Sequence, residues 1–543
     1  MLWYTTNGYM STFFRKLETT VTGGAILIAT ASLASRVLGL FRDRLLSSRI
    51  GPGDVLDGYY VAFRLPDFLF NILILGALSS AFIPVFIELW HKAHEEGEEP
   101  KDAWHLVHNL MTVFLVMLAI LSVLGIIFAP QIVPVFAPGF HGNTLHESIV
   151  LTRIMLLSIL FFGASNIISS VLNSLKRFFA FAFAPIFYNV GIIIGILYLY
   201  PMMGYTGLGW GVVIGAFLHL CVQIPSARGL GYRFVWAFSA RQKEVRRVFR
   251  MMISRTLGLG AVQLDQTVST MIASTLAAGS VSIFALATNL ASVPISLFGI
   301  SLAIASFPVF SEYLAAKDHE RFVLEFSRVF RRVLYFTVPV SVLFLLLRAH
   351  IVRVILGTGM FDWNDTYLTA QALGFLSLSL FAQGLIPMLA RSFYAMQDTA
   401  TPVKISLVAV VMNIAGGLTL GPRMGVEGLA LSFSLASIVQ MLLLLIMLRV
   451  RLGPLDDVRI LNSTLKIIVA SSVMAMVVWL MLRFFALGIN NRTFVGILMQ
   501  GAGAGIVGVL VYMATTMLFR FDEVNLIRQW MSKARRQLTR NGE

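Results

Sequence analysis

The chain has 543 residues, of which 57% are hydrophobic and only 13% are charged, and its formal net charge is +15. A water-soluble fold of this length cannot bury so large an apolar fraction, and the mean hydropathy of +0.81 is typical of a protein dissolved in lipid. The composition excludes a soluble globule, and no soluble segment offers a basic face for nucleic acid.

Apolar segments long enough to cross a bilayer recur along the whole chain. A hydrocarbon core of about 30 Å needs roughly 20 apolar residues in one helix. By this measure we predict an all-α polytopic membrane protein with about 14 membrane helices. Their predicted centres lie near residues 33, 74, 118, 161, 192, 216, 262, 297, 340, 381, 412, 437, 475 and 507.

The first helix resembles a signal peptide, but its apolar run continues into Arg36 and Arg42 without a cleavage site, so we expect it to be retained. With a cytoplasmic N-terminus, about 30 Lys and Arg residues fall at cytoplasmic helix ends and about six on the other side. We therefore expect both termini in the cytoplasm. The basic tail from Arg520 to Arg540 has the spacing of an interfacial helix.

The two halves of the chain resemble each other. The segment Ala81 to Glu88 recurs as Ala305 to Glu312, and Gly204 to Gly209 recurs as Gly425 to Ala430. About six helices separate the copies, which predicts parallel repeats and two six-helix lobes facing a central cavity. The expected organisation is an N-lobe over 1–225, a cytoplasmic linker over 226–250, a C-lobe over 251–450, two further helices over 451–519 and a basic cytoplasmic tail over 520–543.

Ionisable residues at membrane depth are the main functional signal, because such charges are costly unless they are paired or face water. Arg36, Arg42 and Asp43 lie in the first helix, and Asp57, Arg64 and Asp67 follow. Guanidinium groups offer a planar fork of donors that fits phosphate oxygens. We therefore expect a site for an anionic cargo, with Asp43 orienting one arginine. For Asp57 and Arg64, a position at the membrane interface is an equal alternative.

In the second lobe, Asp265 lies in an otherwise apolar helix that Arg255 begins. Such a carboxylate is a candidate ion-coupling site, and a structural hydrogen-bonding role is an equal alternative. Asn189 and Asn413 occupy comparable places in the two lobes, where interhelical hydrogen bonds are the simpler explanation. Neither an ATP-binding loop nor a catalytic triad is recognisable, so we expect no catalytic residue, no metal and no cofactor. A monovalent cation gradient or the membrane potential remains as the source of energy.

The run Ser35 to Asp43 and the run Asp57 to Asp67, followed by Ala81 to Pro84, resemble the MurJ (MviN) lipid II flippases of the MOP exporter superfamily. The segment Phe393 to Lys404 agrees with the same family. This resemblance implies a bacterial inner-membrane transporter that flips undecaprenyl-pyrophosphate-linked peptidoglycan precursor by alternating access. It implies cargo contacts for Arg36 and Arg42, nearby acidic positions at Asp43 and Asp57, and an ion-site acid at Asp265.

Two positions depart from the family pattern. Phe70-Asn71 and Thr288-Asn289 stand where the family has arginines, so half of the expected arginine quartet is absent. Arg64 or Arg255 could substitute. Two alternatives therefore remain open: an exporter of another polyprenyl-linked saccharide in the same superfamily, and a membrane scaffold that recruits cell-wall synthesis proteins. The expected partners are the lipid-linked precursor and membrane lipids.

Overall fold

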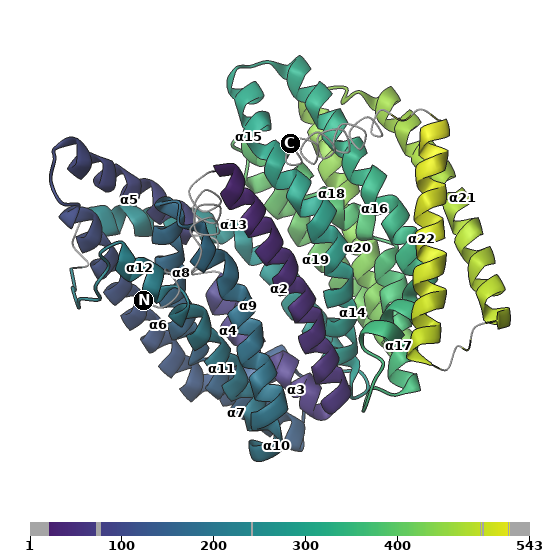
Figure 1. Cartoon of the computed structure of the whole chain (residues 1–543), viewed down its shortest axis with the longest axis horizontal. Helices are drawn as coiled ribbons and strands as arrows, with labels where there is room; N and C mark the ends of the chain where they lie inside the picture. Colours follow the sequence, from purple (N-terminus) through teal and green to yellow (C-terminus); the bar gives the residue numbers. More distant parts are fainter. Residues whose placement is uncertain are drawn as a thin grey trace, which may run out of the picture. The chain divides into compact units, whose positions relative to one another are not determined.

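The computed structural model describes residues 21–71, 78–239, 243–488, 490, 493–519 and 521 (Figure 1). Within these ranges the side chains of residues 21–26, 78–80 and 253–264 are also left out. Every regular element in the described ranges is a helix, which confirms the predicted all-α class. The predicted interfacial helix of the tail lies outside the described residues, apart from Phe521.

The chain divides into two compact units, Met1–Ser282 and Ile283–Glu543. The first unit contains α2 (Val21–Arg49), α3 (Asp54–Ala62), α4 (Arg64–Phe70), α5 (Leu78–Glu95), α6 (Lys101–Phe136), α7 (Gly142–Met155), α8 (Ser158–Ser174), α9 (Phe178–Ile194), η2 (Gly195–Leu199), α10 (Tyr200–Met203), α11 (Tyr205–Cys221), α12 (Ile224–Gly229) and α13 (Lys243–Ser274). In it, α9 packs against both α2 and α11.

The division falls at the start of α14 (Ser280–Pro294), later than the predicted linker over 226–250. The second unit continues with η3 (Ile295–Ile300), α15 (Ser301–Ala315), α16 (His319–Ile355), α17 (Trp363–Ser377), α18 (Leu380–Ala395), α19 (Ala400–Met424), α20 (Val426–Leu452), α21 (Asp457–Gly488) and α22 (Phe494–Leu518). The lobe boundaries of the sequence analysis stay a prediction.

Ten helices of the described residues are long and apolar enough to cross a membrane, or eleven when the bent pair α17 and α18 is one span. The predicted number of 14 is therefore not confirmed. The side chains of α2 and α13 are described only in part, and the predicted helix around residue 74 is divided into α3, α4 and α5, with residues 72–77 outside the described ranges.

The helical hydrogen bonding is interrupted within two predicted spans, of which only the second is sharply bent. The span around residue 161 divides into α7 and α8, and the span around residue 381 divides into α17 and α18, bent by 47°. At each break a serine hydroxyl donates to the carbonyl three residues earlier, Ser158 to Met155 at 2.6 Å and Ser379 to Leu376 at 3.1 Å. Such local bonds compete with the helical ladder, which explains why an apolar run need not be one helix.

The internal repeat of the sequence reappears in the backbone. Gly204 and Gly425 each separate two helices, with φ of 63° and 64°, a conformation that favours glycine. Phe86 and Phe310, at matching places of the other repeated segment, are both fully buried in the core of their unit. The same local sequence therefore builds the same turn and the same core position in both halves.

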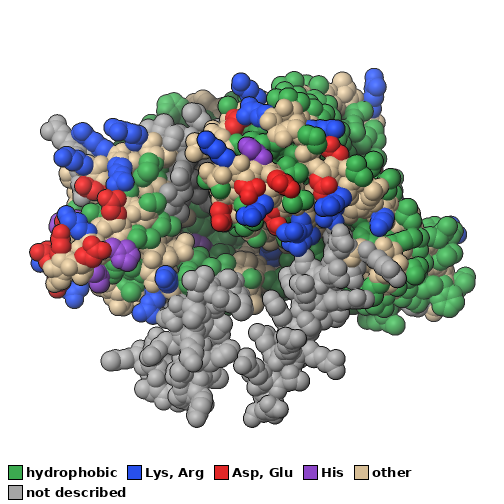
Figure 2. Space-filling model, turned by 90° about the horizontal axis from the view of Figure 1, so that it is seen from above, with side chains coloured by type: hydrophobic (Ala, Val, Ile, Leu, Met, Phe, Trp, Pro, Cys, Tyr) green, Lys and Arg blue, Asp and Glu red, His purple; other side chains and the backbone are tan. Residues whose placement is uncertain are grey.

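Each unit has its own apolar core, built largely from helix faces of Phe, Leu, Val and Ala. On the face seen in Figure 2, Lys, Arg, Asp and Glu side chains gather, whereas hydrophobic side chains cover much of the surface at its edge. This separation of charged and apolar surface is what a lipid environment requires.

Candidate functional site

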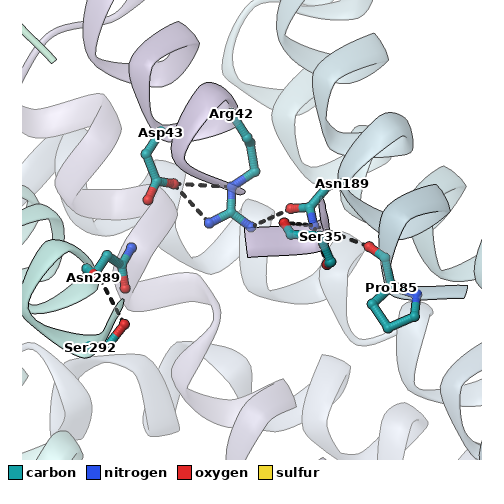
Figure 3. A network of polar contacts seen from close by, with 7 residues as sticks. All are labelled: Ser35, Arg42, Asp43, Pro185, Asn189, Asn289 and Ser292. Atoms are coloured by element: carbon teal, nitrogen blue, oxygen red, sulfur yellow. Dashed lines mark hydrogen bonds and ion pairs between the residues drawn. The ribbon is translucent and has the colours of Figure 1, made fainter. Parts of the chain in front are cut away.

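Arg42 is the centre of a polar network inside the first unit (Figure 3). Its Nε and Nη2 donate to Asp43 Oδ1 at 3.1 and 2.8 Å, and its Nη1 donates to Asn189 Oδ1 on α9 at 3.2 Å. The Asn189 amide nitrogen donates in turn to Ser35 Oγ at 3.3 Å and to the Pro185 carbonyl at 3.1 Å. The arginine is thus fixed by two helices at once.

A guanidinium has five N–H donors, and three of those on Arg42 are used by Asp43 and Asn189, so two remain. The Arg42 side chain is 22% exposed and that of Asp43 is 4% exposed. Asp43 accepts two hydrogen bonds from the Arg42 guanidinium, and the two remaining N–H donors are available to an anion.

The other predicted site residues lie in different surroundings. Arg36 is exposed on α2, six residues before Arg42. Arg64 is partly buried at the start of α4, its Nε–H donates to no described partner, and Asp67 and Tyr60 act on it electrostatically. The side chain of Arg255 lies outside the described residues. Asp265 is partly buried in α13 and takes part in an interaction.

Asp57 is 2% exposed and does not join the Arg42 network among the described contacts. Its two carboxylate oxygens accept from the backbone N–H groups of Gly279 and Ser282, each at 2.7 Å, at the start of α14. A carboxylate at a helix N-terminus satisfies free N–H groups and complements the helix dipole. Asp57 therefore acts as the cap of α14, a contact over more than two hundred residues that sequence spacing cannot indicate.

The positions where the family has arginine contain packing residues here. The Phe70 ring lies 5.1 Å from that of Phe162 on α8. In the second unit, Asn289 accepts from Ser292 at 2.7 Å, and the Thr288 hydroxyl is buried with no described hydrogen-bond partner. None of these side chains supplies a cation, so the phosphate contacts that arginines would make at these positions are absent.

Two adjoining cavities lie within the first unit and share Phe70, Phe162 and His219 in their walls. The first, of about 250 Å³, is also lined by Asp67 and Tyr188. The second, of about 290 Å³, is lined mainly by the polar face of α8: Asn166, Ser169, Ser170 and Asn173. Both cavities are roomy and polar enough to hold several water molecules.

His219 of α11 belongs to a hydrogen-bonded chain that links it to α8. Ser169 Oγ donates to Gln223 Oε1, and Gln223 Nε2 donates to Ser165 Oγ, each at 2.7 Å. Ser165 Oγ lies 2.7 Å from His219 Nδ1 and 3.4 Å from the His219 carbonyl. The sequence analysis missed His219 and Gln223, although polar residues in the apolar run over 212–225 were the available signal.

The described residues contain no group of three His, Cys, Asp or Glu side chains that could hold a metal ion. Membrane-spanning helices, two units with repeated elements, and an internal arginine, Arg42, bonded across two helices define a polytopic membrane transporter. A sequence profile of the family "Lipid II flippase MurJ" matches residues 46–498, and the chain belongs to this family. It is an inner-membrane transporter of a lipid-linked precursor rather than an enzyme.

Individual relatives agree with the family profile. The chain is 29% identical over 436 residues to the lipid II flippase MurJ of Burkholderia cenocepacia, covering 78% of this chain and 83% of that protein. It is 27% identical over 503 residues to the probable lipid II flippase MurJ of Rhizobium tropici, covering 91% and 92%.

Solved structures agree as well. The fold is similar to that of lipid II flippase MurJ in an inward closed conformation, with a TM-score of 0.75 and 26% identity over 91% of this chain and 98% of that one. An inward-facing multidrug resistance MATE family transporter of the MOP superfamily has a TM-score of 0.64 at 13% identity, covering 80% and 99%, which shows a shared fold alone. The resemblance expected from the sequence is confirmed.

Proposed function

We propose that this chain moves lipid II from the inner to the outer leaflet by alternating access, with Arg42 holding the pyrophosphate of the cargo. The observation behind this assignment is the fixed guanidinium of Arg42, which keeps two free N–H donors beside Asp43 and Asn189. Arg36, exposed on the same helix, adds a second cation. Both termini lie in the cytoplasm under this proposal, since the positive charges then face the cytoplasmic side.

The test is flipping of a fluorescent lipid II in liposomes that contain the purified full-length chain. Arg42→Ala removes both free donors and is expected to lower the flipping rate at least about tenfold, because charge-assisted hydrogen bonds contribute roughly 1.5–3 kcal/mol each. Arg42→Lys keeps the charge but loses the planar fork of donors. Its flipping rate should therefore lie between that of Arg42→Ala and that of the unchanged chain.

Arg49→Ala is the matched control, because Arg49 is exposed in the last turn of α2. An Arg42→Ala protein that flips as fast as the unchanged chain contradicts the cargo role of Arg42. If instead removal of residues 520–543 abolishes function in cells while Arg42→Ala does not, the chain acts as a scaffold. Flipping of another polyprenyl-linked saccharide in preference to lipid II would redefine the cargo.

A further inference from the structure

We propose that the cavity between α4, α8, α9 and α11 is a proton-binding site formed by Asp67 and His219, and that proton uptake there couples to cargo movement. The coupling part of this proposal rests on the proposed flippase function. The binding of the proton does not depend on that function. Its basis is that a carboxylate and an imidazole line one internal cavity of about 250 Å³.

Asp67 lines this cavity, and its carboxylate has no described hydrogen-bond donor or ion-pair partner. Asp67 is partly buried on α4, and its backbone alone takes part in helix hydrogen bonds. A carboxylate withdrawn from bulk water and not fully paired binds a proton more readily than an exposed one. Water in the cavity can connect it to the imidazole of His219, which lines the same cavity.

The hydrogen bonds around His219 accommodate both protonation states of the ring. Ser165 Oγ already accepts from Gln223, so its own hydrogen is directed to His219 Nδ1 when the ring is neutral. When Nδ1 gains a proton, it can donate to Ser165 Oγ, and the serine hydrogen turns to the His219 carbonyl at 3.4 Å. One rotation of a hydroxyl therefore allows a proton to enter or leave the ring.

The charged and titratable neighbours favour a proton over a metal cation. The described residues supply no group of three His, Cys, Asp or Glu side chains for a metal ion, whereas a proton needs only one oxygen or nitrogen atom. Arg64 faces Asp67 from the preceding turn of α4, and its positive charge opposes both kinds of cation. The other groups that act on Asp67 or its neighbours are Tyr59 and Tyr60 of α3, Tyr188 of α9, and Arg42 and Asp43 of α2. Helix α8 contributes only neutral side chains to the cavity.

The cavity is connected to the cargo arginine through one helix. Tyr188 lines the cavity and interacts electrostatically with both Asp67 and Arg42. The next residue, Asn189, accepts from Arg42 Nη1 at 3.2 Å. A proton gained at Asp67 or His219 adds one positive charge to this wall, which weakens the field that holds the Arg42 guanidinium. Uptake and release of a proton can thus alternate with binding and release of the cargo phosphates.

The coupling is tested in liposomes that contain the full-length chain and fluorescent lipid II, with the membrane potential held at zero by potassium and valinomycin. One pH unit across the membrane changes by about tenfold any equilibrium that moves one proton, so the flipping rate should respond several-fold to the gradient. Asp67→Asn and His219→Gln should each remove this response. Asp102→Asn, exposed in the first turn of α6, and His350→Gln in the second unit should keep it.

Proton binding is measured separately, so that its failure and that of the proposed function can be told apart. Infrared difference spectra of the purified protein between two pH values should contain a protonated-carboxyl band that Asp67→Asn removes. The nitrogen chemical shifts of labelled histidine should contain a titration that His219→Gln removes. Melting temperatures of the variants exclude loss of folding. A flipping rate indifferent to the pH gradient, a response to a sodium gradient instead, or an unchanged response in both variants would overturn the proposal.

Discussion

At the scale of single residues, the structure separates charges that were alike in the sequence. Arg42 is held by two helices, Arg36 is exposed, and Asp57 caps a helix that begins more than two hundred residues later. Each of these environments depends on whether a neighbouring helix places a hydrogen-bonding group beside the charge. Residue type alone therefore identified candidates but did not assign their roles.

Asp398 allows a prediction about pH at this scale. Burial opposes the charge of its carboxylate, but hydrogen bonds from Ala400 and Thr401 and the charge of Arg451 outweigh burial, and the pKa lies below its ordinary value. Asp398 and Arg451 also form an ion pair. A carboxyl whose pKa is lower in the folded state stabilises the protein above its unfolded pKa and loses that effect as the pH falls through the folded value.

Asp398→Asn keeps an oxygen that can accept from Ala400 and Thr401 but loses the negative charge beside Arg451 and the start of α19. It should therefore lower the stability of the protein at neutral pH by about 0.5–1 kcal/mol. The loss should become smaller as the pH falls below about 4, where the unfolded carboxyl is protonated. Thermal unfolding of the variant and the unchanged chain in detergent at several pH values measures this difference in stability. Asp362→Asn, which changes the capping box of α17, is a comparison variant without the Arg451 pair. A difference from the unchanged chain that stays constant with pH contradicts this assignment.

At the scale of elements, glycines set how closely helices approach. A Cβ on Gly191 of α9 would lie 2.2 Å from the Gly215 Cα of α11, and a Cβ on Gly207 would lie 2.4 Å from the Leu199 carbonyl oxygen. Such contacts cannot be relieved by rotating a side chain, because backbone is opposite backbone. Small residues at membrane helix contacts commonly have this function.

Gly191→Ala should destabilise the first unit by roughly 1–3 kcal/mol, since overpacking forces two helices apart. Gly229→Ala is the matched control, because nothing lies within 4 Å of the added Cβ. Melting temperatures of both variants in the same detergent provide the measurement. If Gly191→Ala and Gly229→Ala melt alike, the close approach of α9 and α11 is not a source of stability.

At the scale of the whole molecule, the boundary between the two units falls inside α14, and Asp57 holds the residues just before it. Alternating access requires some contacts of this kind to form and break as the protein changes conformation. The Asp57 contact uses two backbone N–H groups and is specific in geometry, and all three of its residues lie within the first unit.

A disulfide can test whether the Asp57 contact opens during the proposed transport. The pair Asp57→Cys and Ser282→Cys, with the single native Cys221 changed to Ser, should form a disulfide under oxidation if the two backbones stay close. Flipping should then stop and return on reduction to the rate of the Asp57→Cys variant alone. Equal flipping by the oxidised and the reduced protein would show that this contact stays closed throughout transport.

The sequence by itself determined the class of the protein. The apolar fraction and the length of the apolar runs require lipid as solvent, and repeated segments such as those ending at Phe86 and Phe310 predict a two-fold internal architecture. The motif residues of the first helices indicated the family. These inferences succeed because hydropathy and short motifs are local properties of the chain.

Only the tertiary structure decided which polar residues act together. The Arg42 network needs Asn189 from a helix far along the chain, and the cavity needs Asp67 and His219 from two separate helices. Breaks within spans, such as that at Ser158, follow from local hydrogen bonds that hydropathy does not measure. The physical reason is that burial, pairing and cavity formation depend on the packing of helices, which a one-dimensional pattern does not contain.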